Sequence, residues 1–345
     1  MNELKLNETP IRTSRNFLIN NIKLTDVEIP ETVEKFKNIE IIGGKNITEN
    51  IEEAKLTYGL GEILQNNIIK NSNSKLNINA ENEEIKIIYN FDDDNINLIN
   101  NIVVNAAKKC KLYIVYKSNT NKECFHNGVI KINALENSKI DVVVVNTMNK
   151  NSNNFEAYEN IIGTNASVNY TIIDIGGKNS ITNYYSNILG EKAKNDLKTI
   201  YLGAENHIKD LNYIAELRGK QSFIDIDVQG ALSGNAKKNF KGTIDFKKGC
   251  KKAKGNENEF CMLLSEKARS IALPMLLCTE SDVEGNHSTA SGKVDNQELF
   301  YIMSRGLSYN EAVKLIVKAR FNKILSRIED EDLRNEIIEK IEEQL

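Results

Sequence analysis

Apolar positions along this chain of 345 residues change their spacing twice, and the changes divide it into three regions. Residues 1–74 are predicted to be mostly helix and loop. Residues 75–294 show the period of two that is typical of strands, and residues 295–345 return to a helical period. We therefore expect an N-terminal helical or loop region, a β-rich core and a small C-terminal helical domain.

In the first region, apolar residues recur at helical spacing between Ile51 and Ile69. They are Ile51, Ala54, Leu60, Ile63, Leu64 and Ile68. This spacing predicts a helix. Gly59 and Gly61 weaken that helix and can interrupt it, because glycine is a poor helix former.

The middle region contains short runs rich in Val, Ile and Tyr, separated by Asn, Gly, Asp and Lys. Examples are Ile85–Tyr89, Leu112–Tyr116, Ile140–Val145, Val168–Ile173, Ile181–Tyr185, Phe223–Val228 and Gly242–Phe246. No long helical stretches interleave with them, which disfavours a doubly wound α/β sheet. A sandwich, a barrel and a β-solenoid remain, and the periodicity does not choose among them. Frequent Asn near strand ends suits a solenoid, where stacked turns can hydrogen-bond like side chains into ladders.

The C-terminal region carries clear helix-capping signals. Asp295 with Glu298, and Ser308 with Glu311, have the spacing of an N-terminal capping box, and Gly306 is suited to a helix C-terminus. The second helix is predicted to run to about Arg327. Its apolar stripe is Ala312, Leu315, Ile316, Ala319, Ile324 and Ile328, and a third helix is predicted over Glu331–Gln344.

The composition is that of an ordinary globular protein, with 40% hydrophobic and 27% charged residues and a net charge of -3. That balance does not favour nucleic acid or an anionic membrane as a partner. The first residues lack the features of a signal peptide, and no stretch approaches the roughly 20 apolar residues that span a bilayer. Five cysteines, with no C-x-x-C pair, indicate reduced thiols. We expect a cytoplasmic protein.

Common catalytic motifs are absent from the sequence. Gly292-Lys293 is followed by Val294 and does not complete a phosphate-binding loop, so we expect this chain to bind no nucleotide. There is no H-E-x-x-H and no G-x-S-x-G, and the chain has only three histidines. Carboxylates are plentiful, which leaves open a β-solenoid enzyme acting on polysaccharides.

The stretch from Phe240 to Arg320 carries a series of motifs that resembles the C-terminal signature of the SufB/SufD family. It contains F-x-G-x-I at Phe240, Gly242 and Ile244, N-x-x-x-x-LLS from Asn258, a Pro-anchored strand with Ala272 and Pro274, a turn with a histidine, and LFY-x-x-SRG from Leu299 to Gly306. The opening PIRTSRNFLIN and YGLGEIL segments also resemble the N-terminal region of shorter family members.

This resemblance implies a right-handed parallel β-helix flanked by helical ends, and a scaffold for iron–sulfur cluster assembly that is not itself an enzyme. It implies pairing with a second SufB/SufD-type subunit, docking of an ABC-type ATPase (SufC) and a cysteine desulfurase as sulfur donor. A transient cluster would form at the subunit interface. In the family the ATPase binds the helical end, which points to Leu299, Phe300, Tyr301, Arg305 and Gly306 here.

The resemblance also nominates metal-site residues. His287 aligns with the family's cluster-site histidine, and Glu284 and Cys278 are the further candidates. The D-type subunit often carries a cysteine two residues before this histidine, where this chain has Gly285. Cys278 lies in an apolar strand, where a buried, inert thiol is the default expectation. A structural ATPase partner that holds no cluster is therefore an alternative function.

A basic run lies near the end of the strand region. Its members are Lys237, Lys238, Lys241, Lys247, Lys248, Lys251, Lys252 and Lys254. A nucleic-acid surface would need interleaved aromatic residues and a basic domain. Only Phe240 and Phe246 interleave, and both alternate as core residues would. We expect the run to be a solvated turn.

Overall fold

The computed structural model describes residues 3–13, 19–51 and 55–345. Its N-terminal elements are β1 (Leu4–Leu6), β2 (Ile22–Leu24), β3 (Ile39–Ile42), β4 (Ile47–Thr48) and α1 (Glu62–Asn71). The core strands are β5 (Ser74–Ala80), β6 (Glu83–Phe91), β7 (Asn97–Ala106), β8 (Lys109–Ser118), β9 (Phe125–Ala134), β10 (Lys139–Thr147), β11 (Asn153–Ile162), β12 (Ser167–Asp174), β13 (Asn179–Ile188), β14 (Lys194–Gly203), β15 (Ile208–Leu217), β16 (Phe223–Leu232), β17 (Lys237–Phe246), β18 (Ala253–Leu263), β19 (Arg269–Cys278) and β20 (Val283–Lys293). The C-terminal helices are α2 (Asn296–Met303), α3 (Tyr309–Leu325) and α4 (Glu331–Gln344).

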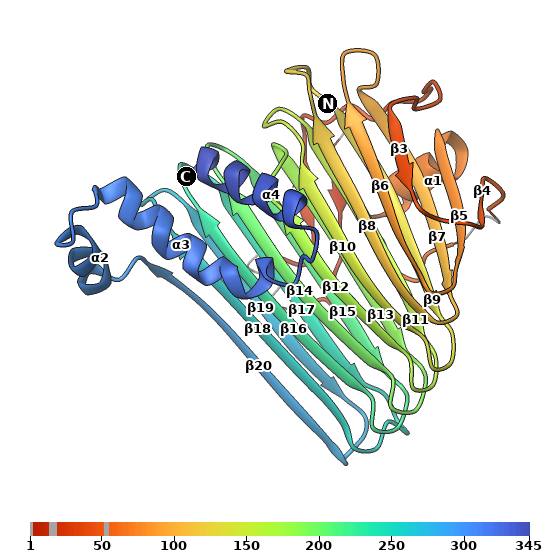
Figure 1. Cartoon of the computed structure of the whole chain (residues 1–345). Coiled ribbons are helices and arrows are strands. Elements are labelled where there is room, and N and C mark those ends of the chain that lie inside the picture. Colours follow the sequence, from red (N-terminus) through yellow and green to blue (C-terminus); the bar gives the residue numbers. More distant parts are fainter. Residues whose placement is uncertain (1–2, 14–18, 52–54) are drawn as a thin grey trace.

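The core strands form a parallel β-solenoid of about 8 turns (Figure 1). Even-numbered strands from β6 to β20 build one sheet and odd-numbered strands from β5 to β19 build the other, so each turn contributes one strand to each sheet. All pairings between these core strands are parallel. The expected β-helix is therefore confirmed.

Asparagine ladders join successive turns, as the sequence suggested for a solenoid. The Asn133 amide donates to Asn105 Oδ1 at 2.8 Å, and the Asn179 amide donates to Asn153 Oδ1 at 2.7 Å. The paired residues are 28 and 26 positions apart in the chain, which is the length of one turn there. A stacked amide satisfies its own polar groups without breaking the backbone ladder.

Apolar residues fill the space between the two sheets. The core strands send alternate side chains inward, and the interior cluster that they form runs from Leu76 on β5 to Ala268 before β19, with Phe36 of the N-terminal segment added to it. The predicted runs Ile85–Tyr89 on β6 and Gly242–Phe246 on β17 both contribute to it.

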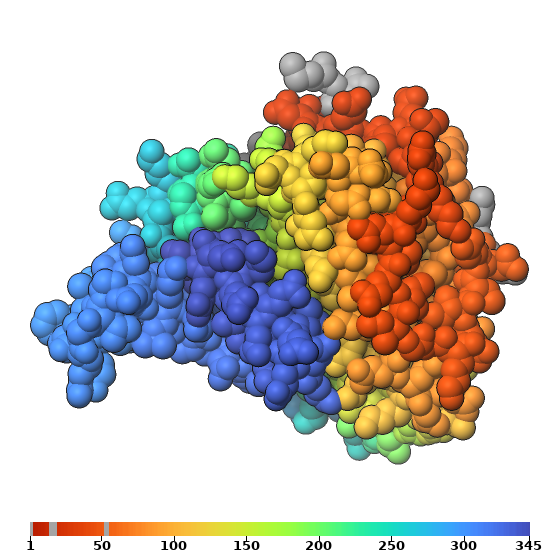
Figure 2. Space-filling view, turned by 45° about the horizontal axis from the view of Figure 1, so that its top comes forward, coloured from red at the N-terminus to blue at the C-terminus, as the bar shows by residue number. Residues whose placement is uncertain are grey.

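Each outer face of the solenoid is covered by one end of the chain. Helices α3 and α4 lie over the even-numbered sheet, where Phe321 and Ile337 pack with strand residues such as Val145 (Figures 1 and 2). The N-terminal segment and α1 lie over the odd-numbered sheet, where Leu6 and Leu64 belong to a third apolar cluster.

A buried ion pair anchors the N-terminal segment. The Lys241 ammonium donates to Asp210 Oδ1 at 2.6 Å and to the Asn7 carbonyl at 2.9 Å. The Asn7 side-chain amide donates to the same Asp210 oxygen at 2.6 Å. All three side chains are buried on the outer face of the odd-numbered sheet.

The N-terminal region differs from the prediction. It contains four short strands, and α1 begins only at Glu62, because Gly59 and Gly61 adopt φ values of 133° and 131° that no right-handed helix accommodates. Ala54 lies outside the described residues. Tyr58 instead packs edge-on against Tyr185 and donates to Glu216 Oε1 at 3.3 Å, so the YGLG segment fixes the N-terminal layer to the odd-numbered sheet.

The C-terminal helices begin where their caps predicted. The Asp295 side chain accepts hydrogen bonds from two backbone amides of α2, and Ser308 forms a complete capping box with Glu311 on α3. Leu315 and Ala319 were expected in the apolar stripe of α3, but both are exposed, Leu315 by 46%. Helix α2 has no buried residue and projects beyond the sheets, as Figures 1 and 2 show.

None of the helices in the described ranges is both long and apolar enough to cross a membrane.

Candidate functional site

The last turn of the solenoid is open. Strand β19 pairs only with β17, and β20 pairs only with β18, so both strands leave one edge free. Most residues of β20 are exposed, in contrast to the buried strands of the middle turns. This end therefore offers backbone donors and acceptors as well as the inward-facing side chains of the last turn.

His287 lies in the middle of β20, not in the turn that the sequence suggested. Gly285 shows which side of β20 His287 faces. A Cβ atom at Gly285 would lie 2.9 Å from Cε2 of Phe246, which belongs to the interior cluster, so position 285 faces the interior. His287 is two residues further along the same strand and so faces the interior side. No turn stacks above it, and the imidazole is exposed at the open end.

The structure separates the other two predicted metal ligands from His287. Glu284 is an odd number of residues away and faces the outside, where it pairs with Lys254 at 2.9 Å. Cys278 is the last residue of β19, at the corner where the chain turns toward β20. It was expected to be buried but is exposed, and its thiol donates to the Glu280 carbonyl at 2.8 Å.

Across the described ranges, no three His, Cys, Asp or Glu side chains are grouped so that they could hold a metal ion. The remaining cysteines are Cys110, Cys124, Cys250 and Cys261, and all four are buried. Burial raises the pKa of the Cys261 thiol, which disfavours the thiolate form that binds metals. The predicted set of His287, Glu284 and Cys278 is thus not assembled within one chain.

Sequence reasoning missed Glu257, which lies directly beneath His287. The two residues are partners in the parallel register of β18 and β20. Glu257 is buried, and neither carboxylate oxygen has a hydrogen-bond partner among the described residues. Burial raises the pKa of Glu257 to about 8, and the neighbouring Glu259 adds to the rise.

Gly242 explains how Glu257 fits inside the solenoid. Gly242 lies on β17 in the opposite sheet, and a Cβ there would overlap the Glu257 carboxyl group. The carboxyl group therefore lies against the Gly242 backbone, which gives the glycine of the F-x-G-x-I motif a packing role.

A second buried carboxylate lies two residues further along β18. Glu259 Oε1 accepts hydrogen bonds from the Lys238 ammonium at 2.7 Å and from the Tyr201 hydroxyl at 2.9 Å. Unlike Glu257, Glu259 has a cation beside it. Glu259 and Lys238 lie in the solenoid interior near the open end.

Lys238 corrects the interpretation of the basic run. Lys238 and Lys241 are both fully buried and ion-paired, one inside the solenoid and one under the N-terminal segment. Lys237, Lys238 and Lys241 lie on β17 and Lys254 lies on β18, so half of the run belongs to strands and not to a solvated turn. The spacing of two between Lys238, Phe240 and Gly242 was the signal that Lys238 faces inward.

A second polar cluster lies in the interior of the N-terminal half of the solenoid, on β7, β9 and β11. His126 Nδ1 and Nε2 lie 2.6 Å from the side-chain oxygens of Asn154 and Asn100, and His126 Nε2 lies 3.7 Å from Glu156. Burial raises the pKa of Glu156 to about 8 and lowers the pKa of His126 to about 4. Both side chains are therefore neutral near pH 7.

The predicted docking residues are mostly exposed. Phe300 is 75% exposed and Tyr301 is 59% exposed, and the Arg305 guanidinium stacks on the Tyr301 ring. Leu299 is only partly buried and packs against the apolar cluster under the helices. Gly306 takes a φ of 100° at the turn into α3. Exposed aromatic side chains on a projecting helix are typical of a protein-binding surface.

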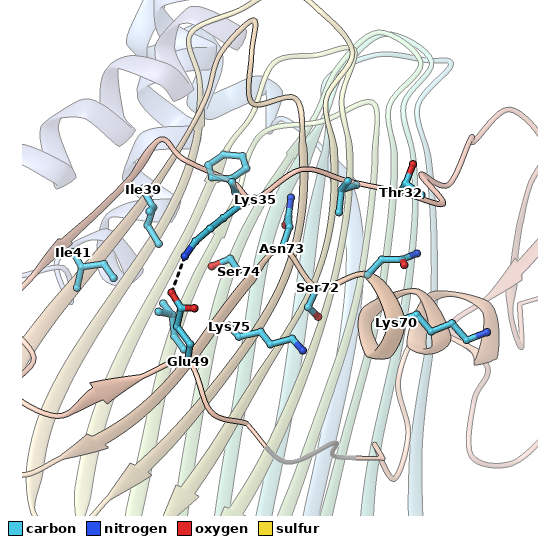
Figure 3. A pocket seen from close by; sticks show the side chains of 14 residues that line it. Thr32, Lys35, Ile39, Ile41, Glu49, Lys70, Ser72, Asn73, Ser74 and Lys75 are labelled. Carbon is cyan, nitrogen blue, oxygen red and sulfur yellow. Dashed lines mark hydrogen bonds and ion pairs between the residues drawn. The ribbon is translucent and has the colours of Figure 1, made fainter.

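A solvent-open pocket lies at the opposite end of the solenoid (Figure 3). Its lining includes Lys70 and Lys75, and the Lys35 ammonium pairs with Glu49 across it at 2.9 Å. It contains none of the predicted site residues. The open end is therefore the better candidate for function.

The part of the chain that matches a known family includes the open end of the solenoid. Residues 61–320 match the family described as "SUF system FeS cluster assembly, SufBD core domain". The chain is 24% identical over 268 residues to the iron–sulfur cluster assembly protein SufD of Bacillus subtilis, a match that covers 76% of this chain and 61% of that protein. It is 33% identical over 179 residues to an iron–sulfur cluster assembly SufBD family protein of Pyrococcus horikoshii, covering 48% of this chain and 37% of that protein. A SufD protein of Plasmodium berghei matches at 25% identity over 301 residues, 81% of this chain and 22% of that protein.

The matches thus span about three fifths or less of the length of these relatives. The family match covers the solenoid, the strand with His287 and the projecting helix α2. The chain belongs to the SufB/SufD family of iron–sulfur cluster assembly proteins.

Proposed function

We propose that this chain is a scaffold subunit on which an iron–sulfur cluster forms at an interface with a second SufB/SufD-type subunit. It acts with a SufC-type ABC ATPase and receives sulfur from a cysteine desulfurase. The chain itself hydrolyses no ATP and catalyses no self-contained reaction, because its role is to hold the growing cluster.

The observation that carries this proposal is the position of His287. Its imidazole is exposed on the last strand of an otherwise closed solenoid, at an edge where another subunit can pair. Imidazole nitrogen is a suitable ligand for iron. One chain supplies too few ligands for a cluster, so the other ligands would come from the subunit across the interface.

The position of α2 supports the ATPase partner. Helix α2 follows β20 after a link of only two residues, Val294 and Asp295, so the exposed Phe300 and Tyr301 are directly connected to the strand that carries His287. An ATPase bound there would act on the edge of the cluster site.

A second function rests on a specific observation. Glu284 and Cys278 do not converge on His287, and position 285 is glycine. These facts support a subunit that docks the ATPase but holds no cluster. By contrast, the part of the chain that the structure describes offers only scattered carboxylates in support of a polysaccharide-active enzyme.

Anaerobic reconstitution tests the scaffold proposal. The complex of this chain, a second SufB/SufD-type subunit and the ATPase would be supplied with ferrous iron and sulfide, and its bound iron and sulfide would be quantified. We expect His287→Ala to lower cluster content while leaving the melting temperature and ATPase binding nearly unchanged, because an exposed side chain contributes less than about 0.5 kcal/mol to stability. Equal cluster content in wild type and His287→Ala would favour the ATPase partner without a cluster.

A further inference from the structure

The open end of the solenoid contains an unpartnered buried carboxylate directly below an exposed imidazole. Glu257 on β18 and His287 on β20 are register partners, and both side chains face the interior side of the sheet. Neighbouring strands lie about 4.8 Å apart, so the two side chains follow one another along the solenoid axis at that spacing.

Glu257 differs from Glu259, the other buried carboxyl group at this end, because no cation of the described residues pairs with it. Lys238 neutralises Glu259 at 2.7 Å, whereas neither oxygen of Glu257 has a partner among the described residues. A buried carboxyl group without hydrogen bonds is rare in native proteins, and a bound ion is one explanation of such a group. The carboxylate is separated from the open end only by the last turn, which β19 and β20 form.

From this arrangement we propose that Glu257 and His287 together bind one divalent transition-metal ion, such as Fe²⁺, at the open end of the solenoid. The inference rests on the proposed function in that it assigns His287 to metal binding, and it adds a carboxylate ligand from the turn below. A carboxylate oxygen and an imidazole nitrogen are a ligand pair that suits Fe²⁺, and water would complete the coordination. Metal binding would displace the proton that the buried Glu257 carboxyl group otherwise keeps.

Single substitutions test whether Co²⁺ binds at Glu257 and His287 or at carboxylates on the surface. The untagged full chain would be titrated with Co²⁺ alone under anaerobic conditions, and binding would be followed by calorimetry and by the visible absorption of bound cobalt. Glu257→Gln preserves the shape of the side chain and removes its charge. Glu284→Gln is the matched control, because Glu284 lies on the same pair of strands but faces outward toward Lys254.

We expect one bound Co²⁺ per chain, with affinity about tenfold or more weaker in both Glu257→Gln and His287→Ala and unchanged in Glu284→Gln. Histidine-selective NMR adds a direct readout, since His126 and His207 are buried and only His287 is exposed. Co²⁺ should shift or broaden the His287 resonance in wild type and much less in Glu257→Gln. The melting temperature of each variant checks that it folds, and Glu257→Met provides a second uncharged variant.

Unchanged Co²⁺ affinity in both Glu257→Gln and Glu257→Met would overturn the inference. That result would leave the scaffold function standing if His287→Ala still lowered cluster content in the assembled complex. Conversely, loss of Co²⁺ binding in Glu257→Gln, together with normal cluster content in the His287→Ala complex, would support the ion site and contradict the role of His287 in cluster formation.

Discussion

The backbone of Gly242 lies against the carboxyl group of Glu257 across the interior of the solenoid. The two residues come from opposite sheets, β17 and β18, and belong to the same turn. Gly242 is thus required for space and not for backbone flexibility.

This contact predicts that Gly242→Ala destabilises the protein, because the new methyl group would overlap the Glu257 carboxyl group. Overpacking of this kind costs about 1–3 kcal/mol, which denaturant unfolding can measure. Gly292→Ala is the matched control, since nothing lies within 4 Å of a Cβ at that position.

The same experiment has an internal check. Glu257→Ala should remove most of the penalty of Gly242→Ala, so the double variant should be more stable than the sum of the single effects implies. Additive effects would contradict the contact.

The buried Glu156 predicts a pH-dependent stability. Because burial raises its pKa to about 8 from an ordinary value of 4.5, the folded state binds more protons than the unfolded state between these values. The contribution of Glu156 to the free energy of unfolding is fully present below pH 4.5 and is lost as the pH rises through about 8. The slope from one group is at most about 1.4 kcal/mol per pH unit.

Glu156→Gln should therefore flatten the fall in the free energy of unfolding between pH 6 and pH 8, as measured by urea titrations at several pH values. The neighbouring His126 has a lowered pKa, so its contribution runs the opposite way and lies below pH 6.5. Glu136→Gln, at an exposed position, should leave the slope as it is. Parallel curves for wild type and Glu156→Gln would show that Glu156 is ionised in the folded protein.

The exposed aromatic side chains of α2 predict a binding phenotype. Phe300→Asp combined with Tyr301→Asp should abolish co-elution with the ABC ATPase in size-exclusion chromatography, because each aromatic anchor of an interface contributes about 2 kcal/mol or more. Their exposure predicts little change in melting temperature. Asn310→Asp, at an exposed position on the next helix, α3, is the control. Normal co-elution of the double variant would place the ATPase elsewhere.

The buried pair of Lys241 and Asp210 predicts a large stability effect at a position that looks like surface in the sequence. Lys241→Ala would leave Asp210 buried without its cation and should cost about 3–5 kcal/mol in the free energy of unfolding. Lys237→Ala, four residues earlier and exposed, should change little. Lys241→Met with Asp210→Asn should recover much of the loss, and a failure to do so would mean that the pair is not the cause.

These cases show what the sequence could and could not predict. The strand runs and the capped helices α2 and α3 were recognisable because their signals are local. The solenoid itself was not distinguishable from a sandwich or barrel by periodicity, because each core strand pairs with a partner about 26 to 32 residues away. Only the family resemblance resolved the fold.

The site was less predictable for the same reason. Whether Lys238 or Glu284 faces the interior depends on strand alternation, and whether Glu257 meets His287 depends on the register between turns. A basic run and a Gly-Asn sequence both look like solvent-exposed turns when strand boundaries are unknown. The sequence therefore identified His287 but neither its strand nor its neighbour.

The two ends of the solenoid have opposite consequences for assembly. At the N-terminal end, β3 and β4 run antiparallel to the turn they cover and are only 4 and 2 residues long, so they offer little edge for a further chain. At the other end, β19 and β20 present edges of 10 and 11 residues. Two such solenoids that join through their long edges leave only short, poorly pairing edges at both outer ends. Growth by strand addition then stops at a pair and does not continue into a fibre.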